Sequence, residues 1–434
     1  MRKLIALLGL CVLFASSATY AQVDADEIQE LREQIEMLTR RLDQLETRNR
    51  QMSEAMQQSD QRTVAEAEAE TDEKINAAVA EQVDDKMATV SWAERLRWKG
   101  DFRYRYENID QEGTDSRNRS RIRARTHLEA DLSPTLEVGI GLATGGDDPV
   151  SSNQTIGGGG SSKDIKIDLA YFDWSGLTDT NITGGKFKNY LIRPGGKGLR
   201  WDADWRPEGL GAIWDNDRVY VQGLGTWLEG DSKNGTEFGW AVQAGLKFKT
   251  GETGKLSFGI GYTVFDIAGR TPLFGEPDDF YGNSFIPDPN DPNVPPILIF
   301  KYNYQNYEAF ADWKMMLGNH PFALFANYTV NTEADENDTG YLLGAKYGSA
   351  KARGTWDVSY WYARLEADST IGLVSDSDFA GGGTDAKGHV FSGTYAFHKN
   401  WNFKATYFIT EKYISRQDPL DHDRFQMDMN FKFQ

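Results

Sequence analysis

Residues 96–107 read LRWKGDFRYRYE, and this stretch decides the fold class. Every second side chain is aromatic or apolar, apart from one glycine, and the side chains between them are all charged. Because successive side chains of a β-strand point to opposite faces, this period of two predicts a strand. The strand has one apolar face and one charged face.

The next segment, 119–132, repeats the pattern, with Ile122, Leu128 and Leu132 opposite arginine and acidic side chains. Two such strands would also suit a soluble sandwich, whose apolar face points inward. The persistence of the pattern favours a transmembrane barrel of about sixteen antiparallel strands, an even number typical of bacterial outer-membrane barrels. The further expected strands lie near 135–144, 165–174, 180–188, 209–214, 218–229, 236–249, 255–266, 299–314, 321–331, 339–349, 354–366, 388–398, 401–411 and 422–433.

The connections between these strands alternate in length. Tight turns are expected at 133–135, 215–217, 318–320 and 398–400, and long loops at 145–164, 188–207, 267–298 and 367–387. Short turns on one side and long loops on the other are typical of outer-membrane barrels, with the short turns in the periplasm. The barrel is predicted over 92–434, with both of its ends on the periplasmic side.

The N-terminus carries the features of an export signal. Arg2 and Lys3 precede an apolar run from Leu4 to Phe14, and small residues follow up to Ala21. This predicts a signal peptide over 1–21, because about 11 apolar residues are too few for a membrane-spanning helix. The sole cysteine, Cys11, lies inside the signal, so disulfides and thiolate metal sites are excluded from the mature chain. The net charge of −18 argues against a nucleic-acid partner.

Residues 22–60 are predicted to form a periplasmic coiled coil, followed by a helical neck or linker over 61–91. Apolar residues repeat at spacings of three and four between charged ones, which indicates a coiled-coil seam. The segment Arg41–Glu46 fits an Arg-apolar-x-x-apolar-Glu motif of three-stranded coils, whereas Asn49 at a core position leans toward two strands. We favour a homotrimer. The residues expected to carry it are Ile28, Leu31, Ile35, Leu38, Arg41, Leu42, Leu45 and Glu46.

The chain resembles the putative porin family of Gram-negative bacteria. The resemblance rests on KGDFRYRYE at 99–107, on 119–125, on 139–149 with its ATGGDDP run, and on AYFDW at 170–174. It covers the barrel and extends to the coiled coil. Membership implies an outer-membrane channel without specifying its substrate.

The charged faces of the first two strands are expected to form a basic wall inside the barrel. A barrel of about sixteen strands encloses an aqueous channel, and charged side chains around a pore set its ion selectivity. The same side chains could instead be a structural cluster neutralised by Glu107, Glu129, Asp131 and loop carboxylates, and both interpretations can hold together. The basic wall consists of Arg95, Arg97, Lys99, Arg103, Arg105, Arg119, Arg121, Arg123 and Arg125.

The third long loop, 189–208, is the expected constriction, because in general porins the corresponding loop folds into the lumen. If its carboxylates face the basic wall, a transverse field crosses the channel and favours small polar solutes. Its two tryptophans could stack on sugar rings, but packing of the folded-in loop is favoured. The candidate residues are Arg193, Lys197, Arg200, Trp201, Asp202, Asp204, Trp205 and Glu208.

These features favour a passive diffusion channel for ions and small hydrophilic solutes, seated in outer-membrane lipid. The alternative is a structural protein whose coiled coil tethers the barrel to the periplasm or the cell wall. No enzymatic activity is expected, since no nucleophile and base can be assigned. The five histidines have no paired metal-ligand spacing, and no glycine loop joins a strand to a helix, so neither a metal nor a cofactor is expected.

Overall fold

A computed structural model describes residues 95–433, except 232, 234 and 274–277, together with the single positions 37, 41 and 48. The predicted signal peptide, coiled coil and neck lie outside the described residues, apart from Met37, Arg41 and Arg48 within the coiled coil. Within the described part of the chain, no helix has the length and apolar character needed to span a membrane.

Among the described residues, sixteen strands form the barrel, as predicted. They are β1 (Leu96–Gln111), β2 (Arg117–Ser133), β3 (Leu136–Thr144), β5 (Ile165–Leu177), β6 (Thr180–Lys186), β7 (Glu208–Asp215), β8 (Val219–Glu229), β9 (Glu237–Thr250), β10 (Gly254–Phe265), β13 (Tyr304–Leu317), β14 (His320–Asn331), β15 (Thr339–Gly348), β16 (Trp356–Leu365), β17 (Ala386–His398), β18 (Trp401–Lys412) and β19 (Leu420–Phe433).

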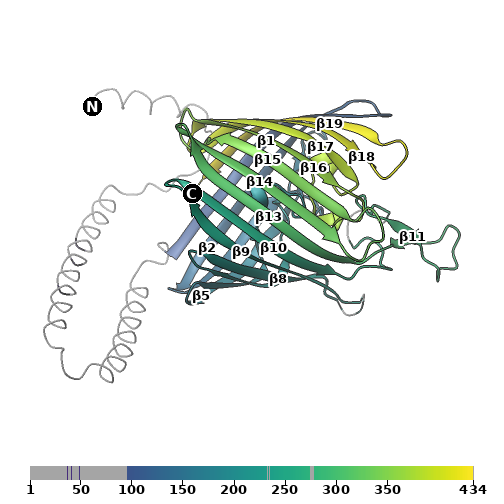
Figure 1. Cartoon of the computed structure of the whole chain (residues 1–434), viewed down its shortest axis with the longest axis horizontal. Helices are drawn as coiled ribbons and strands as arrows, with labels where there is room; N and C mark the ends of the chain where they lie inside the picture. Colours follow the sequence, from purple (N-terminus) through teal and green to yellow (C-terminus); the bar gives the residue numbers. More distant parts are fainter. Residues whose placement is uncertain are drawn as a thin grey trace, which may run out of the picture. The chain divides into compact units, whose positions relative to one another are not determined.

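Each barrel strand pairs antiparallel with its neighbours, and the first strand closes on the last. The register between β1 and β19 runs from Gly100 opposite Phe433 to Gln111 opposite His422. Closure leaves the described sheet without a free edge, which a membrane-embedded sheet requires because lipid cannot satisfy exposed backbone groups. Figure 1 shows the strands inclined around this barrel.

Within the described ranges, three short strands and three 3₁₀ turns lie outside the barrel ladder. β4 (Gln154–Thr155) pairs with β2, and β11 (Phe285–Pro287) pairs with β12 (Leu298–Phe300). The 3₁₀ turns are η2 (Pro194–Gly196), η3 (Gly372–Val374) and η4 (Phe379–Gly381). The prediction of one strand over 299–314 is therefore wrong at its start. Phe300 pairs with Phe285 in the hairpin, and the barrel strand begins only at Tyr304.

The connections alternate in length as the sequence predicts. β2 and β3 are joined by two residues, 134–135, whereas β10 and β13 are separated by 266–303. The β11–β12 hairpin projects from the long-loop end, opposite the C-terminus (Figure 1). The strands therefore have a short-turn end, which holds Leu96 and Phe433, and a long-loop end.

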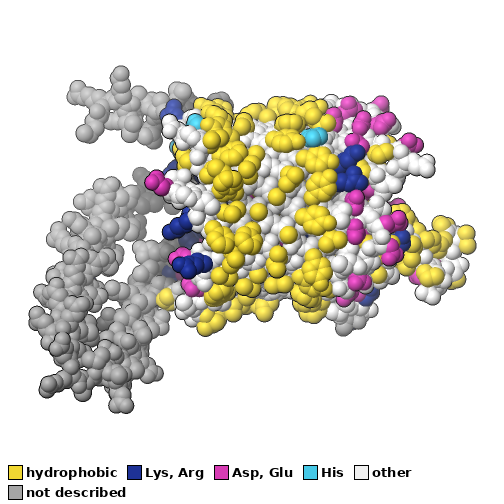
Figure 2. Space-filling view, in the orientation of Figure 1, with side chains coloured by type: hydrophobic (Ala, Val, Ile, Leu, Met, Phe, Trp, Pro, Cys, Tyr) yellow, Lys and Arg dark blue, Asp and Glu magenta, His cyan; other side chains and the backbone are white. Residues whose placement is uncertain are grey.

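The outward face of the barrel is apolar. Large side chains remain solvent-exposed there, including Trp98 at 66% and Ile260 at 65%. Figure 2 shows the hydrophobic belt, with Asp and Glu side chains gathered toward the long-loop end. A belt of this kind suits the hydrocarbon layer of a bilayer, where the alternation places apolar residues outside and polar residues inside.

Candidate functional site

The basic side chains of β1 and β2 lie on the inward face, in register with one another. Arg103 is opposite Arg123, and Arg105 is opposite Arg121. The alternate residues point outward, as shown by Phe102 at 38% exposure. Arg97 and Lys99 lie nearer the short-turn end, where both pair with Glu129, and Arg95 lies just before β1.

Carboxylates neutralise much of this basic wall. Asp101 accepts from Arg123 at 2.9 Å and from Arg125 at 2.8 Å. Glu107, wholly buried, pairs with Arg119. Arg105 is 3% exposed and pairs with Asp428 of β19 at 2.7 Å. Asp428 was not predicted as a site residue, because only closure of the barrel brings β19 beside β1.

Loop 189–208 crosses the barrel interior. The amide of Gly195, at the tip of the loop, donates to Oδ1 of Asp312 on β13 at 3.0 Å. Lys197 Nζ reaches Ser359 Oγ on β16 at 3.4 Å. At its base, Ile192 N donates to the side chain of Gln243 on β9 at 2.7 Å. The loop therefore touches inward-facing side chains of strands far from the β6–β7 hairpin that carries it.

The two tryptophans of this loop are packing residues. Trp201 is 2% exposed and Trp205 is 4% exposed, and their rings stack with centroids 5.1 Å apart. Arg200 lies under Trp201, with its guanidinium carbon 4.9 Å from the ring centroid, and forms a buried ion pair with Glu308 at 3.2 Å. These three side chains fix the loop inside the barrel and offer no exposed face to a solute.

The other residues predicted for the constriction loop have different surroundings. Glu208 opens β7, is exposed and pairs with Lys186 at 2.5 Å. Arg193 is half-buried, and its Nη1 has no hydrogen-bond partner among the described residues. Asp202 is buried and accepts from the amide of Ser377 at 2.9 Å. Burial, followed by the charges of Asp376 and Asp204, raises the pKa of Asp202 well above its usual value.

Asp204 is the loop carboxylate that faces the basic wall. It pairs with Arg123 at 3.3 Å and with Arg125 at 2.8 Å. Burial opposes its ionisation, yet the charges of Arg123 and Arg125 outweigh that effect and lower the pKa of Asp204 to about 2. The carboxylate is therefore ionised at neutral pH.

The residues of these ion pairs line two cavities. One, of about 530 Å³, is lined by Asp204 and by residues at the long-loop end, such as Asp148 and Leu228. The other, of about 410 Å³, is lined by Arg123, Arg125 and residues toward the short-turn end. Asp204 lies in the lining of the first cavity and contacts arginines that line the second.

A second loop, 366–385, also folds inward, which the sequence analysis missed. Leu373 is 1% exposed and Val374 is fully buried. Asp378 pairs at 2.9 Å with both Arg105 and Arg424, and although burial opposes its ionisation, these arginines hold its pKa well below the usual range. The apolar run at 371–374 was the available signal, because a solvated extracellular loop has little reason to carry it.

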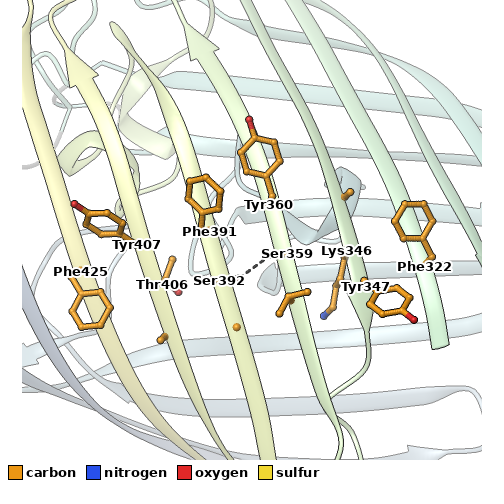
Figure 3. Close-up of a pocket in the computed structure, with 14 residues that line it drawn as sticks. Phe322, Lys346, Tyr347, Ser359, Tyr360, Phe391, Ser392, Thr406, Tyr407 and Phe425 are labelled. Atoms are coloured by element: carbon orange, nitrogen blue, oxygen red, sulfur yellow. Dashed lines mark hydrogen bonds between the residues drawn. The ribbon is translucent and has the colours of Figure 1, made fainter. Parts of the chain in front are cut away.

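A hollow of about 570 Å³ lies on the outward face. Figure 3 shows aromatic side chains around it, among them Tyr360, Phe391 and Tyr407. The hydrogen bond between Ser359 and Ser392, 2.8 Å long, belongs to the inward row behind it (Figure 3). The hollow faces lipid and is separate from the interior cavities.

The described residues contain no group of three or more His, Asp or Glu side chains placed to hold a metal ion. The chemistry available in the interior is that of fixed charges and hydroxyl or amide groups. Such groups attract, orient and exclude solutes by charge and size.

Comparisons with known proteins agree with this architecture. The model of a family described as "Putative porin" matches residues 110–283 and 297–433. OprB of Pseudomonas putida, solved at high pH, is 12% identical, with 79% of this chain and 95% of that chain covered and a TM-score of 0.53. The trimer form of OmpT of Vibrio cholerae is 14% identical, with 78% and 99% covered and a TM-score of 0.47. No curated protein sequence matches the chain.

Proposed function

Because the chain belongs to the putative porin family, we propose that Asp204 and the basic wall form the selectivity constriction of its channel. The protein is an outer-membrane β-barrel channel for small solutes. The finer proposal concerns where passing solutes are sorted. We assign this to the contact of loop 189–208 with β2, and we take transport to be passive diffusion of ions and small hydrophilic solutes.

One observation carries the assignment. The carboxylate of Asp204, which lines one cavity, meets Arg123 and Arg125, which line the other, at 3.3 and 2.8 Å. Negative charge on the loop side and positive charge on the β2 side produce a field across the passage. Such a field favours small polar solutes over apolar ones, because a dipolar solute or water can align with it and a hydrocarbon cannot.

Planar-bilayer recording tests the channel and its constriction together. The purified protein is expected to give stepwise current, and the Arg121→Glu, Arg123→Glu double variant should shift the reversal potential in a salt gradient toward cation selectivity. The matched control is Arg218→Glu with Lys249→Glu, the same charge change at exposed positions near the short-turn end. Equal selectivity in the double variant and the control would place the constriction elsewhere.

A further inference from the structure

Three lysines from separate elements converge beneath loop 189–208. Lys197 belongs to the loop, Lys346 to β15 and Lys404 to β18. Lys197 Nζ lies 3.4 Å from Ser359 Oγ, and Ser359 is the register partner of Lys346. Burial, followed by the charges of Lys404 and Lys346, lowers the pKa of Lys197 to about 7.

Lys346 and Lys404 line the cavity of about 410 Å³. The cavity extends to the 349–351 turn and to Lys432 near the end of β19, so it opens toward the short-turn end. Its volume lies within the range of small-molecule sites, roughly 300–1,000 Å³. Its charged lining is mainly cationic: Arg123, Arg125, Lys346, Lys351, Lys404 and Lys432, against Asp101 and Asp357.

The carboxylates of this lining are already engaged. Asp101 is shared by Arg123 and Arg125. Asp357 accepts from Lys346 at 3.1 Å and from the amide of Ala350 at 3.1 Å. These two carboxylates therefore offer little negative charge to neutralise the other cations that line the cavity.

Lys346 pairs with Asp357, whereas Lys197 and Lys404 form no ion pair with a carboxylate among the described residues. Within the described part of the chain, the side chain of Lys404 forms no ion pair or hydrogen bond, although it is held inside the barrel wall. Among the described residues, Lys197 Nζ makes a hydrogen bond to the Ser359 hydroxyl and lies 5.8 Å from the centroid of the Trp361 ring. Arg103, two strands from β18, contacts Asn153, and its Nε is buried without a partner among the described residues. Like charges held together repel, and a bound anion would relieve that repulsion.

We propose that Lys197, Lys346 and Lys404 form a binding site for a small oxyanion with two negative charges, a sulfate- or phosphate-type group. The anion enters from the short-turn end and lies beneath the loop tip. Ammonium groups act as compact point charges with several donors, and the side chains of Asn402 and Thr394 in the same cavity can donate further hydrogen bonds. The site rests on the proposed channel, since it lies along the same passage.

The basic wall of β1 and β2 is not this site. Arg105, Arg119, Arg123 and Arg125 each have a carboxylate at hydrogen-bonding distance, supplied by the strands or by the two inward loops. An anion would have to displace those carboxylates. At Lys404 it would displace none, so an anion can bind there without breaking an ion pair of that lysine.

Sulfate is the probe, because it stays a dianion at every relevant pH. Chloride current is recorded at pH 6, where Lys197 is protonated, while sulfate is added to one side of the bilayer at constant ionic strength. Sulfate should block the current in a saturable manner. Lys404→Gln should raise the half-blocking concentration about tenfold, the scale of one charge-assisted hydrogen bond. Lys404→Arg, which keeps the charge, should retain the block.

The matched control is Lys399→Gln, an exposed lysine in the turn between β17 and β18, which should leave the block unchanged. Calorimetric titration of sulfate into the detergent-solubilised protein separates the site from the channel. Loss of the binding heat in Lys404→Gln, in a barrel that carries no current, would leave the site standing and remove the channel function. Equal block and equal heat in the wild type and Lys404→Gln would overturn the site.

Discussion

The charged residues of the interior differ in whether they form an ion pair with a group of opposite charge. Arg123 and Arg125 are held by carboxylates of both β1 and loop 189–208. Lys404 has no such partner among the described residues. A matched cluster mainly holds structure, since removing one partner leaves a buried charge uncompensated. Unmatched cations in a water-accessible cavity are instead free to act on passing ions.

Asp204→Asn removes the negative side of the proposed constriction. Arg123 and Arg125 keep Asp101, but the loop no longer offsets their charge. The anion-to-cation permeability ratio should rise about two- to fivefold, because one charge at about 4 Å is worth ~1 kcal/mol in water. Reversal potentials in a potassium chloride gradient measure this ratio.

The control for that change is Asp217→Asn, the same substitution at an exposed turn between β7 and β8. It should leave the permeability ratio at the wild-type value. A ratio that does not differ between the two variants would show that Asp204 does not face the conducting path.

Anion preference should fall as pH rises through about 7. The pKa of Lys197 lies near 7 because burial and the charges of Lys404 and Lys346 outweigh the attraction of Asp376 and Asp357. Lys197 is therefore charged below this pH and neutral above it, so the interior loses one positive charge. Reversal potentials between pH 6 and pH 8 report the change.

Lys197→Gln provides the control, because it removes the titrating group and should flatten this pH dependence while leaving any contribution of other groups in place. A pH dependence that is unchanged in Lys197→Gln would contradict the assignment.

At the scale of elements, two loops occupy the interior and support each other. The amide of Asp202 donates to the carbonyl of Val374 at 2.7 Å, and the amide of Asp376 donates to that of Gly198 at 3.1 Å. The barrel makes room for them with small residues. A Cβ at Gly211 on β7 would lie 1.8 Å from Oη of Tyr190, so a side chain there would push the base of loop 189–208 away.

Trp201→Ala should release loop 189–208 without unfolding the barrel. Truncation of a buried tryptophan typically costs ~3–5 kcal/mol, and the strand ladder itself does not depend on this side chain. Single-channel conductance should rise and its noise increase, because the loop no longer holds one position. Trp214→Ala, an outward-facing residue at 39% exposure, is the control expected to leave both unchanged. Unchanged conductance in Trp201→Ala would mean that the loop does not limit the passage.

At the scale of the whole molecule, closure determines which charges meet. Arg105 of β1 pairs with Asp428 of β19, and Asp378 joins Arg105 to Arg424. This cluster links the two ends of the barrel sequence to loop 366–385. The seam between the first and last strands is thus fixed by backbone pairing and by buried ion pairs.

The coiled coil stays a prediction, and so does the homotrimer. Deleting 24–90 should convert a trimer into single barrels, because the apolar seam that joins three copies is lost, while the conductance per barrel is retained. Light scattering coupled to size exclusion measures the assembly. Replacing 61–87 with a flexible linker of equal length is the control that should keep the trimer. A deletion variant that remains trimeric would assign assembly to the barrels themselves.

The sequence predicted the barrel well because the relevant signal is local. Alternation at 96–107 gives both the strand and the inward direction of its arginines, and connection lengths give the two ends. The alternation of side chains did not predict that loop 366–385 folds into the barrel, because loop residues have no repeating pattern. It also placed Arg200 among the lumen charges, whereas the structure buries it beneath Trp201 against Glu308.

The alternation in 96–107 recurs along the chain. Together these segments determined a closed barrel with an apolar exterior and a charged interior. Tertiary structure alone decided which interior charges are neutralised and which are free. Lys197, Lys346 and Lys404 are far apart in the sequence. Closure brings Lys346 and Lys404 to one cavity, and the inward fold of loop 189–208 brings Lys197 to Ser359, the register partner of Lys346. The physical reason is that the direction in which a side chain points depends on its own strand. The charges that it meets depend on all the strands and loops around the lumen.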